Sequence, residues 1–471
     1  MMSASSSRSW AAFTLLCAGR FMVMLDLMIV VLALPAVQAS FRVTAATTQW
    51  ALSIYGLSFG GFLLLGGKAG DLRGRRRVLV TGLATFSLAS ALGGVAPTVQ
   101  WFIAARALQG LGAALVSPTA FAAATTLFAD ARRGNRVIAI WSALSGIAFP
   151  VGSMLGGLLV AGPGWRWVMF VNVPLGLLGC LLAPRLLPRD EATGRVRRLD
   201  VTGSLTATAG LVALVWALSQ GNARGWGSAL IDLPALAAVA LLIAFVAIER
   251  HAADPVLRLE TFRNRSLVGA NIATLLGNAG LLASLFGLSF FLQRSLSLGP
   301  ETSGLAFVPT AVVFVISTNL SPWMGSRLPA RLLVVAGSIA MAVGFAMYSR
   351  MDASAGFLVP FVLGSVFVGL FGLALPVIFT VGVAGVPAAH RGAASGLLNT
   401  SQQIGGALGL AILAIVQSAA RSPSALGAVP RTAADVIGAQ HGFIACAVFL
   451  IIGAAAAISL IRPDPARAGA A

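Results

Sequence analysis

Apolar stretches long enough to cross a bilayer recur along the whole chain, and short segments with charges, prolines or glycines separate them. A helix of about 20 apolar residues spans a hydrocarbon core about 30 Å thick. The 471 residues are 58% hydrophobic and only 10% charged, whereas a soluble domain carries about 25% charged residues. The pattern therefore predicts an all-α integral membrane protein and excludes a single globular core.

Fourteen membrane helices are predicted by placing helix ends at the charged or Pro/Gly-rich breaks. An even number of spans puts both chain termini on the same side of the membrane. The predicted spans are residues 10–35, 48–67, 78–96, 99–128, 137–161, 166–183, 201–219, 231–248, 266–292, 304–324, 332–349, 356–385, 394–418 and 441–461.

Basic residues outnumber acidic residues, with 32 Lys and Arg against 14 Asp and Glu. Most of the basic residues fall in segments that are cytoplasmic if the N-terminus lies inside. This bias is the positive-inside pattern that sets membrane orientation. We therefore interpret the excess charge as topology, with both termini cytoplasmic, and we expect no nucleic-acid partner.

The longest predicted cytoplasmic connections, residues 184–200 and 249–265, flank the spans at 201–219 and 231–248. Those two spans contain no charge away from their ends, which is typical of a peripheral pair. The sequence thus predicts three parts. They are an N-terminal six-helix bundle at 1–183, a two-helix insert with its linkers at 184–265, and a C-terminal six-helix bundle at 266–471.

Asp26 is the carboxylate that lies well inside an apolar stretch. A charged side chain at such depth costs a few kcal/mol at least, so it usually marks an ion pathway, a proton relay or a binding site. Arg20 and Arg106 are also predicted to lie within spans, and either can stabilise the charged form of Asp26. Arg20 is six positions from Asp26 and off its helical face, which makes Arg106 the better candidate partner.

The segment between the second and third spans reads GKAGDLRGRRR at residues 67–77. Glycines let helix ends approach closely, and Asp71 can pair with arginines or cap a helix. Such a charge cluster can latch one conformation, although the simpler alternative is a positive-inside loop. The candidate latch residues are Gly67, Asp71, Arg73, Gly74, Arg75 and Arg76.

The spacing of that segment resembles the signature loop of the major facilitator superfamily. Other segments resemble the fourteen-helix drug:proton antiporter branch of that superfamily. They read LDLMIVVLALP at 25–35, RALQGLG at 106–112, WRWVMFVNVPLG at 165–176, GAASGLLN at 392–399 and GGALG at 405–409. The resemblance implies the major facilitator fold, with two six-helix bundles plus two inserted central helices, and a role in proton coupling for Arg106 alongside Asp26.

The fifth predicted span carries Gly146, Gly152, Gly156 and Gly157, and a G-x-x-x-G spacing permits close helix contact. The antiporter motif of the family reads G-P-x-x-G-G. This chain has a serine after Gly152 and a proline at Pro150 instead. The face of small residues is kept, but the proline does not lie at the position that it has in the antiporter motif.

Polar side chains recur along several predicted spans and are candidates for lining a substrate cavity. The alternative is that they form hydrogen bonds between helices. Some family members have a carboxylate in the span matching 394–418, and this chain offers only amides there, which argues for neutral or singly charged cargo. The candidate residues are Tyr55, Gln109, Asn271, Asn278, Asn399 and Gln403.

The favoured function is a proton-coupled efflux transporter that exports hydrophobic or amphipathic drugs by alternating access. The alternatives are a proton-linked uptake symporter, a dedicated metabolite exporter or, from another class, a membrane sensor. No nucleotide-binding loop or metal-ligand cluster is recognisable, so no enzyme, cofactor or metal is expected. The expected partners are a small hydrophobic substrate, protons and the lipid bilayer. We expect a monomer in a bacterial cytoplasmic (inner) membrane.

Overall fold

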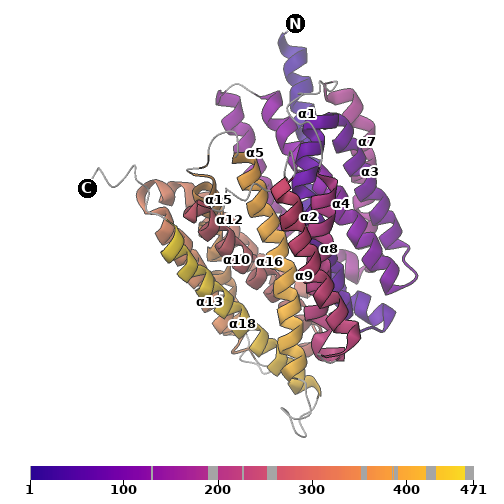
Figure 1. Ribbon diagram of the computed structural model, residues 1–471, viewed down its shortest axis with the longest axis vertical. Helices are drawn as coiled ribbons and strands as arrows, with labels where there is room; N and C mark the ends of the chain where they lie inside the picture. The colour runs from indigo at the N-terminus through magenta and orange to yellow at the C-terminus, as the bar shows by residue number, and fades with distance from the viewer. Residues whose placement is uncertain are drawn as a thin grey trace. The chain divides into compact units, whose positions relative to one another are not determined.

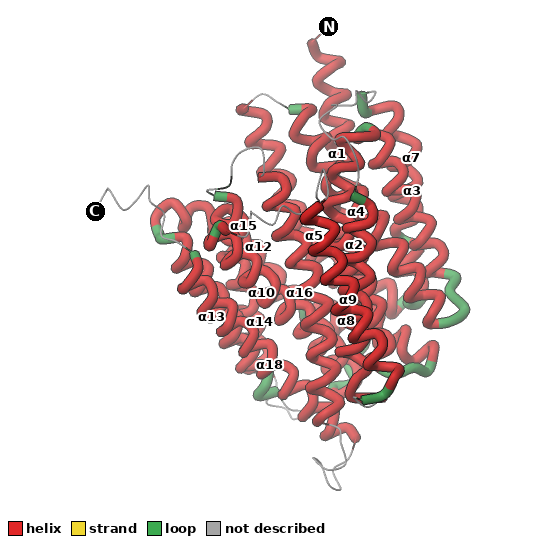
Figure 2. The backbone as a smooth tube through the Cα atoms, viewed as in Figure 1, coloured by secondary structure: helices red, strands yellow, loops and turns green. Residues whose placement is uncertain are grey.

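The computed structural model describes residues 2–128, 131–188, 200–224, 227–251, 263–351, 358–384, 386, 391–420 and 431–461. Helices account for nearly all of these residues, and no strand occurs among them (Figure 2). In the first half of the chain the helices are α1 (Met2–Phe41), α2 (Ala45–Arg73), α3 (Arg75–Gly94), α4 (Val99–Leu127), α5 (Ala131–Ala161), α6 (Arg166–Phe170) and α7 (Asn172–Leu186).

The remaining helices follow in the same manner (Figure 1). They are α8 (Val201–Arg224), α9 (Ala229–His251), α10 (Arg265–Phe290), η2 (Phe291–Ser295), α11 (Pro300–Ala306), α12 (Val308–Arg327), α13 (Ala330–Tyr348), α14 (Leu358–Gly369), η4 (Leu370–Leu373), α15 (Ala374–Val383), α16 (Arg391–Ala420) and α18 (Arg431–Leu460).

The predicted spans agree with the observed helices. Within the described residues, 12 helices are long and apolar enough to cross a membrane. The predicted spans at 137–161 and 394–418 coincide with α5 and α16. The prediction of an all-α membrane fold is therefore confirmed.

Three predicted spans are interrupted helices. The span at 166–183 comprises α6 and α7, which meet at Val171, and the span at 304–324 comprises α11 and α12. Pro174 and Pro309 lie in the first turns of α7 and α12, where a missing backbone N–H costs no helical hydrogen bond. The span at 356–385 changes to a 3₁₀ turn at η4, where a Cβ on Gly372 would lie 2.5 Å from the carbonyl oxygen of Phe314.

The chain forms two compact units. One unit comprises Met1–Ala209 and Leu241–Val256, and the other comprises Gly210–Ala240 and Leu257–Ala471. Helices α8 and α9 are thus divided between the units. The linkers predicted at 184–200 and 249–265 fall mostly outside the described residues, and the division into three parts stays a prediction.

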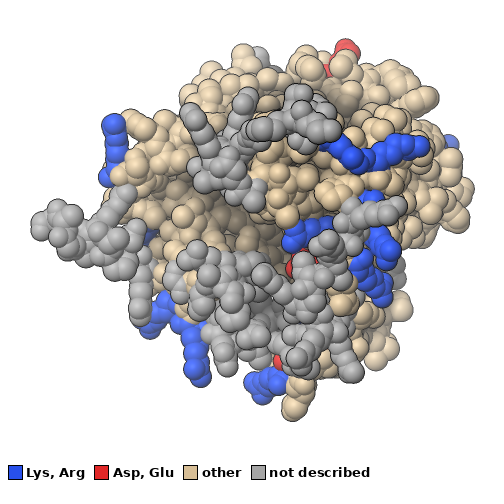
Figure 3. Space-filling model, turned by 90° about the horizontal axis from the view of Figure 1, so that it is seen from above, with Lys and Arg blue, Asp and Glu red and all other residues tan. Residues whose placement is uncertain are grey.

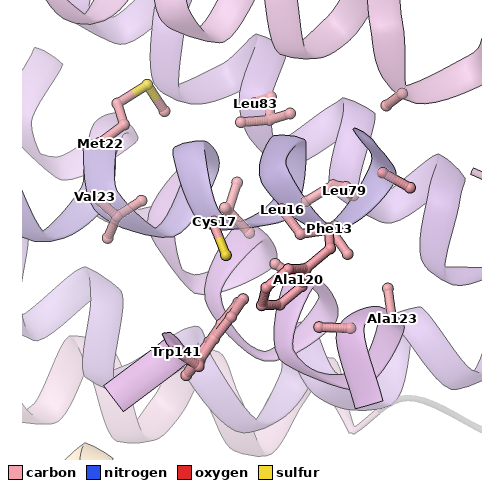
Figure 4. Packing of buried hydrophobic residues seen from close by; sticks show 14 of the residues in the cluster. Phe13, Leu16, Cys17, Met22, Val23, Leu79, Leu83, Ala120, Ala123 and Trp141 are labelled. Atoms are coloured by element: carbon pink, nitrogen blue, oxygen red, sulfur yellow. The ribbon is translucent and has the colours of Figure 1, made fainter. Parts of the chain in front are cut away.

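In the first unit, a hydrophobic cluster surrounds the N-terminal half of α1 (Figure 4). Phe13 and Leu16 of α1 pack with Leu79 of α3, Ala120 of α4 and Trp141 of α5. Fully burying an aliphatic or aromatic side chain stabilises by roughly 1.5–3 kcal/mol. The cluster therefore fixes α1, which carries Asp26, against three neighbouring helices.

Glycines bring α4 unusually close to α2 and α3. A Cβ on Gly112 would lie 2.6 Å from the backbone nitrogen of Phe86 in α3, and a Cβ on Gly110 would collide with the carbonyl oxygen of Tyr55 in α2. On the other side of the contact, a Cβ on Gly66 of α2 would collide with the carbonyl of Ala114. These close contacts fix the face of α4 that carries Arg106.

Candidate functional site

Asp26 lies fully buried in α1 and accepts hydrogen bonds from three side chains. Nη1 of Arg106 donates to Oδ2 of Asp26 at 2.5 Å. Nε2 of Gln109 and Nδ2 of Asn172 donate to Oδ1 at 2.8 Å and 2.7 Å. All three donors are themselves fully buried. The surroundings of Asp26 therefore match the acceptor-only character of an ionised carboxylate.

Arg106 is held by contacts from α2 as well as from α1. Its Nε donates to the carbonyl oxygen of Ala51 at 3.2 Å. The guanidinium carbon lies 4.2 Å from the centroid of the Tyr55 ring, a cation–π geometry. The hydroxyl of Tyr55 in turn donates to the carbonyl of Val23 in α1 at 3.3 Å. Contacts from α1 and α2 thus orient the guanidinium of Arg106.

Gln109 extends the network to α3. It lies three residues after Arg106 and so on the same face of α4. Its Oε1 accepts from Nη1 of Arg106, while its Nε2 also donates to Oγ of Ser90 at 2.7 Å. We call Asp26, Arg106, Gln109 and Asn172 the Asp26 network.

The glycines predicted on α5 pack against the turn of α1 that carries Asp26. A Cβ on Gly152 would lie 2.8 Å from Cβ of Met28, and a Cβ on Gly156 would lie 3.0 Å from Cα of Ile29. Gly157 is buried beside them. The surroundings of Gly146 fall outside the described part of the chain. The G-x-x-x-G spacing therefore does provide a close contact with α1.

The predicted latch segment ties the end of α2 to α4. Gly74 separates α2 from α3 with a backbone φ of 95°, a left-handed value that favours glycine. Nη2 of Arg75 lies 3.3 Å from Oδ1 of Asp71. Nη1 of Arg75 donates to the carbonyl of Ala122 at 2.9 Å and to the hydroxyl of Thr126. Arg75 is thus the connecting residue of this segment.

Other arginines at this end of the first unit bind the end of α7. Nη1 of Arg76 donates to the carbonyl of Pro184 at 3.3 Å, and Nη2 of Arg8 donates to the carbonyl of Arg185 at 2.6 Å. Cations at a helix C-terminus interact favourably with its exposed carbonyls. Arg73 lines a cavity of about 500 Å³ between α2, α3 and α4. Figure 3 shows a face on which Lys and Arg side chains outnumber Asp and Glu.

Gly67 makes a looser contact than its neighbour Gly66. A Cβ on Gly67 would meet only Cβ of Pro118, at 3.6 Å, which is an ordinary van der Waals distance. The glycine that α4 requires at this end of α2 is therefore Gly66, one position before the first glycine of the predicted latch segment.

The candidate cavity residues divide into two groups. Tyr55 and Gln109 both belong to the surroundings of Arg106 and Asp26. In the second unit, Oδ1 of Asn271 accepts from Ser401 at 2.7 Å, and Nδ2 of Asn278 donates to the carbonyl of Gln402 at 2.6 Å. These bonds join α10 to α16. They agree with the alternative interpretation of these amides as interhelical hydrogen-bonding groups.

The remaining two candidates lie on α16. Asn399 is half-buried and donates to the carbonyl of Ser395 in its own helix at 2.9 Å. Gln403 is half-buried one turn later. Their role in lining a cavity stays a prediction.

Sequence reasoning missed two members of this site. Asn172 lies in a segment that resembles the family, yet the sequence did not mark it as a site residue, although an amide two residues before a proline inside an apolar span is a usable signal. Ser90 carries no signal that separates it from other serines in helices. Arg20, the other predicted intramembrane cation, lies over Trp141, with 4.9 Å between the guanidinium carbon and the ring centroid.

Comparison with known proteins decides the family. The family model of the Major Facilitator Superfamily matches residues 16–410 of the chain. The chain belongs to the major facilitator superfamily. It is therefore a multi-pass membrane transporter, as the motifs predicted.

Relatives that are named for antibiotic export or resistance are similar to this chain along nearly its full length. A cephamycin export protein of Amycolatopsis lactamdurans is 38% identical over 98% of this chain and 94% of its own length. A puromycin resistance protein of Streptomyces alboniger is 35% identical over 94% of this chain and 89% of its own length. These relatives agree with the predicted drug-exporting branch of the superfamily.

A solved structure supports the fold independently. A peptide transporter crystallised with sulfate superposes with a TM-score of 0.69 at 14% identity, covering 96% of this chain and 95% of the transporter. At such low identity the likeness concerns the fold alone. The predicted major facilitator fold is confirmed.

Proposed function

We propose that this transporter exports hydrophobic or amphipathic drugs or antibiotics across the bacterial cytoplasmic membrane in exchange for protons. The observation that carries the proposal is the buried ion pair between Asp26 and Arg106. Intramembrane ionisable groups of this kind are functional by default, because burying a charge is costly. The relatives that are named for export or resistance support the outward direction.

Asp26 is the proposed proton site. In the ionised form it is paired with Arg106 and accepts from Gln109 and Asn172. Protonation removes the negative charge and thereby the electrostatic attraction for the guanidinium. Because breaking a buried pair is strongly unfavourable, proton binding can shift the balance between two conformations by several kcal/mol. Alternating access then follows from rocking of two helix bundles around a central site.

The proposed cargo is neutral or carries a single positive charge. Within the described residues of α16, Ser395, Asn399, Gln402 and Gln403 supply polar groups without charge. A dication would need a second buried anion to offset its desolvation. Because α16 supplies no carboxylate among these groups, Asp26 is the proposed site for both the proton and any cationic cargo.

A dedicated exporter is the second candidate function. The two relatives above are each named for a single antibiotic, cephamycin or puromycin. A narrow cargo range agrees with those names. Comparing export of a structurally diverse set of compounds separates the two candidates.

The segment from Gly67 to Arg76 is proposed to latch one conformation of the first unit. Arg75 bridges Asp71 on α2 to Ala122 and Thr126 on α4, so relative movement of these helix ends has to break charged hydrogen bonds. We further propose that the protein acts as a monomer with both termini in the cytoplasm.

The test is export of fluorescent cations and antibiotics from a bacterial host that lacks its own efflux pumps. We expect export that stops with a protonophore and with Asp26→Asn. Asp232→Asn is a matched control. Asp232 is also a carboxylate in a helix, but among the described residues it accepts from the backbone N–H of Gly227 in an exposed hydrogen bond. Faster entry of compounds would favour an uptake symporter instead. Energy-dependent export that persists in Asp26→Asn would remove Asp26 from coupling.

A further inference from the structure

Asn172 lies at the break between α6 and α7, with a fully buried side chain. Its Nδ2 donates to Oδ1 of Asp26 at 2.7 Å. Its own Oδ1 is buried and has no hydrogen-bond partner within the part of the chain that the structure describes. A buried acceptor without a donor is unfavourable, and in folded proteins such groups are uncommon. The free acceptor of Asn172 therefore needs an explanation beyond packing.

The other two donors to Asp26 are fixed in their roles. A guanidinium carries donors only, so Arg106 can never accept a hydrogen bond from a protonated carboxyl. Gln109 uses both ends of its amide, because Oε1 accepts from Arg106 while Nε2 donates to Asp26 and Ser90. If the Gln109 amide turned by half a turn, its Nε2 would face Nη1 of Arg106. Both groups are donors, so neither could accept the hydrogen bond. Asn172 is the donor whose amide can turn without losing a second side-chain hydrogen bond found in the described residues.

Uptake of a proton by Asp26 changes what its neighbours must offer. An ionised carboxylate accepts hydrogen bonds only, whereas a protonated carboxyl has one O–H that must donate. If the proton binds Oδ1, this O–H points toward the amide nitrogens of Gln109 and Asn172, and neither can accept. A half turn of the Asn172 amide replaces Nδ2 with Oδ1 and supplies the missing acceptor.

We propose that Asn172 is a positioning residue whose amide reverses when Asp26 takes up a proton. It donates to the ionised carboxylate and accepts from the protonated carboxyl. The proposal rests on Asp26 being the proton site of the proposed function. Because Asn172 is the first residue of α7, the protonation state of α1 is transmitted to the junction of α6 and α7.

The surroundings of Asp26 contain few other groups that can change charge. Arg106 on α4 and Tyr55 on α2 are the charged and titratable groups that face it within the described residues. The described parts of α5 that pack on this turn of α1 present Gly152 and Gly156. Asn172 is uncharged, so reversal of its amide changes the hydrogen bonding of Asp26 but does not change the local net charge. The bound proton alone changes that charge.

The experiment is infrared difference spectroscopy of the purified protein in lipid nanodiscs across a pH series. Protonated Asp26 is identified as the carboxyl band that Asp26→Asn removes. In Asn172→Leu, the ionised form loses a donor and the protonated form loses an acceptor. The hydrogen bond to the ionised carboxylate is the stronger of the two, so Asp26 keeps its proton to higher pH. We expect the midpoint to rise by roughly one pH unit. The band should also shift in frequency, since the O–H loses its acceptor.

Matched variants separate this effect from loss of folding. Asn319→Leu makes the same substitution at an exposed amide of α12, which within the described residues donates to the carbonyl of Val315 in its own helix. It should leave both midpoint and band unchanged. Asn172→Gln keeps both a donor and an acceptor and should recover most of the wild-type midpoint. Asn172→Ala replaces the leucine variant if leucine does not fold.

Two outcomes would overturn the inference while leaving the proposed function intact. One is a wild-type midpoint in folded Asn172→Leu and Asn172→Ala. The other is a moved midpoint with an unmoved band frequency, because Asn172 would then donate without ever accepting. If no band at any pH depends on Asp26, proton coupling at Asp26 is itself wrong, and the inference falls with it.

Discussion

Nη1 of Arg106 lies 2.5 Å from Oδ2 of Asp26, and both side chains are fully buried. Two charges taken out of water in this way attract each other strongly, but each also loses its hydration. The pair therefore need not stabilise the fold relative to apolar residues. It does make either charge costly to leave alone, which is the property required of a proton-controlled switch.

This property predicts non-additive effects of substitution at the pair. Arg106→Gln alone leaves a buried carboxylate without its cation and should lower the free energy of unfolding by about 3–5 kcal/mol. Asp26→Asn combined with Arg106→Gln should cost less than Arg106→Gln alone. Thermal unfolding of the purified variants in detergent provides the measurement. If the loss in the double variant equals the sum of the losses in Arg106→Gln and Asp26→Asn alone, the two charges act independently.

A second prediction concerns the ring beneath Arg106. Tyr55→Phe keeps the aromatic face at 4.2 Å and loses only the 3.3 Å hydrogen bond to Val23. Tyr55→Leu removes the face itself, and a cation–π contact contributes roughly 0.5–2 kcal/mol. We expect protonophore-sensitive export to survive in the phenylalanine variant and to fall in the leucine variant. The prediction is wrong if both variants transport equally.

The close approach of α4 to α3 predicts a strong effect of one methyl group. Gly112→Ala would place a Cβ 2.6 Å from the backbone of Phe86, and overpacking of this kind costs typically about 1–3 kcal/mol. Gly67→Ala is the matched control, because its Cβ would lie 3.6 Å from Pro118. Alanine has a higher helix propensity than glycine, by up to about 1 kcal/mol, so Gly67→Ala should not lower the unfolding temperature. Comparing unfolding temperatures of the two variants decides the matter.

The turn between α2 and α3 allows a test of backbone strain. Gly74 has a φ of 95°, so Gly74→Ala should destabilise by about 1–3 kcal/mol. Gly299→Ala is the control, since Gly299 has a φ of −60° and a Cβ added there would have no atom within 4 Å. If Gly74→Ala unfolds at the temperature of Gly299→Ala, the conformation of the turn is not under constraint.

Much of the fold could be predicted because the bilayer imposes a simple rule. Backbone polar groups in hydrocarbon must be paired within the segment, so each long apolar stretch becomes a helix. The rule does not show where such a helix is interrupted. The breaks at Val171 and at η4 depend on packing against neighbours, as the contact of Gly372 with Phe314 illustrates.

The candidate site could be predicted in part for a related reason. Asp26 and Arg106 are conspicuous because charges inside apolar stretches are expensive. Asn172 carries no charge, and amides in membrane helices serve structural and functional roles alike. Its importance depends on its contact with Asp26, which lies 146 residues earlier in the chain, and on its Oδ1, which has no hydrogen-bond partner among the described residues. Neither property is visible in sequence.

The close contacts of Gly110 and Gly112 have a consequence for how this transporter can evolve. No side chain larger than hydrogen fits at these positions without moving a neighbouring helix. Two positions close to Arg106 on α4 are thus barred from supplying new contacts to a different compound. Changes in the range of exported antibiotics therefore have to arise at positions other than these two glycines of α4.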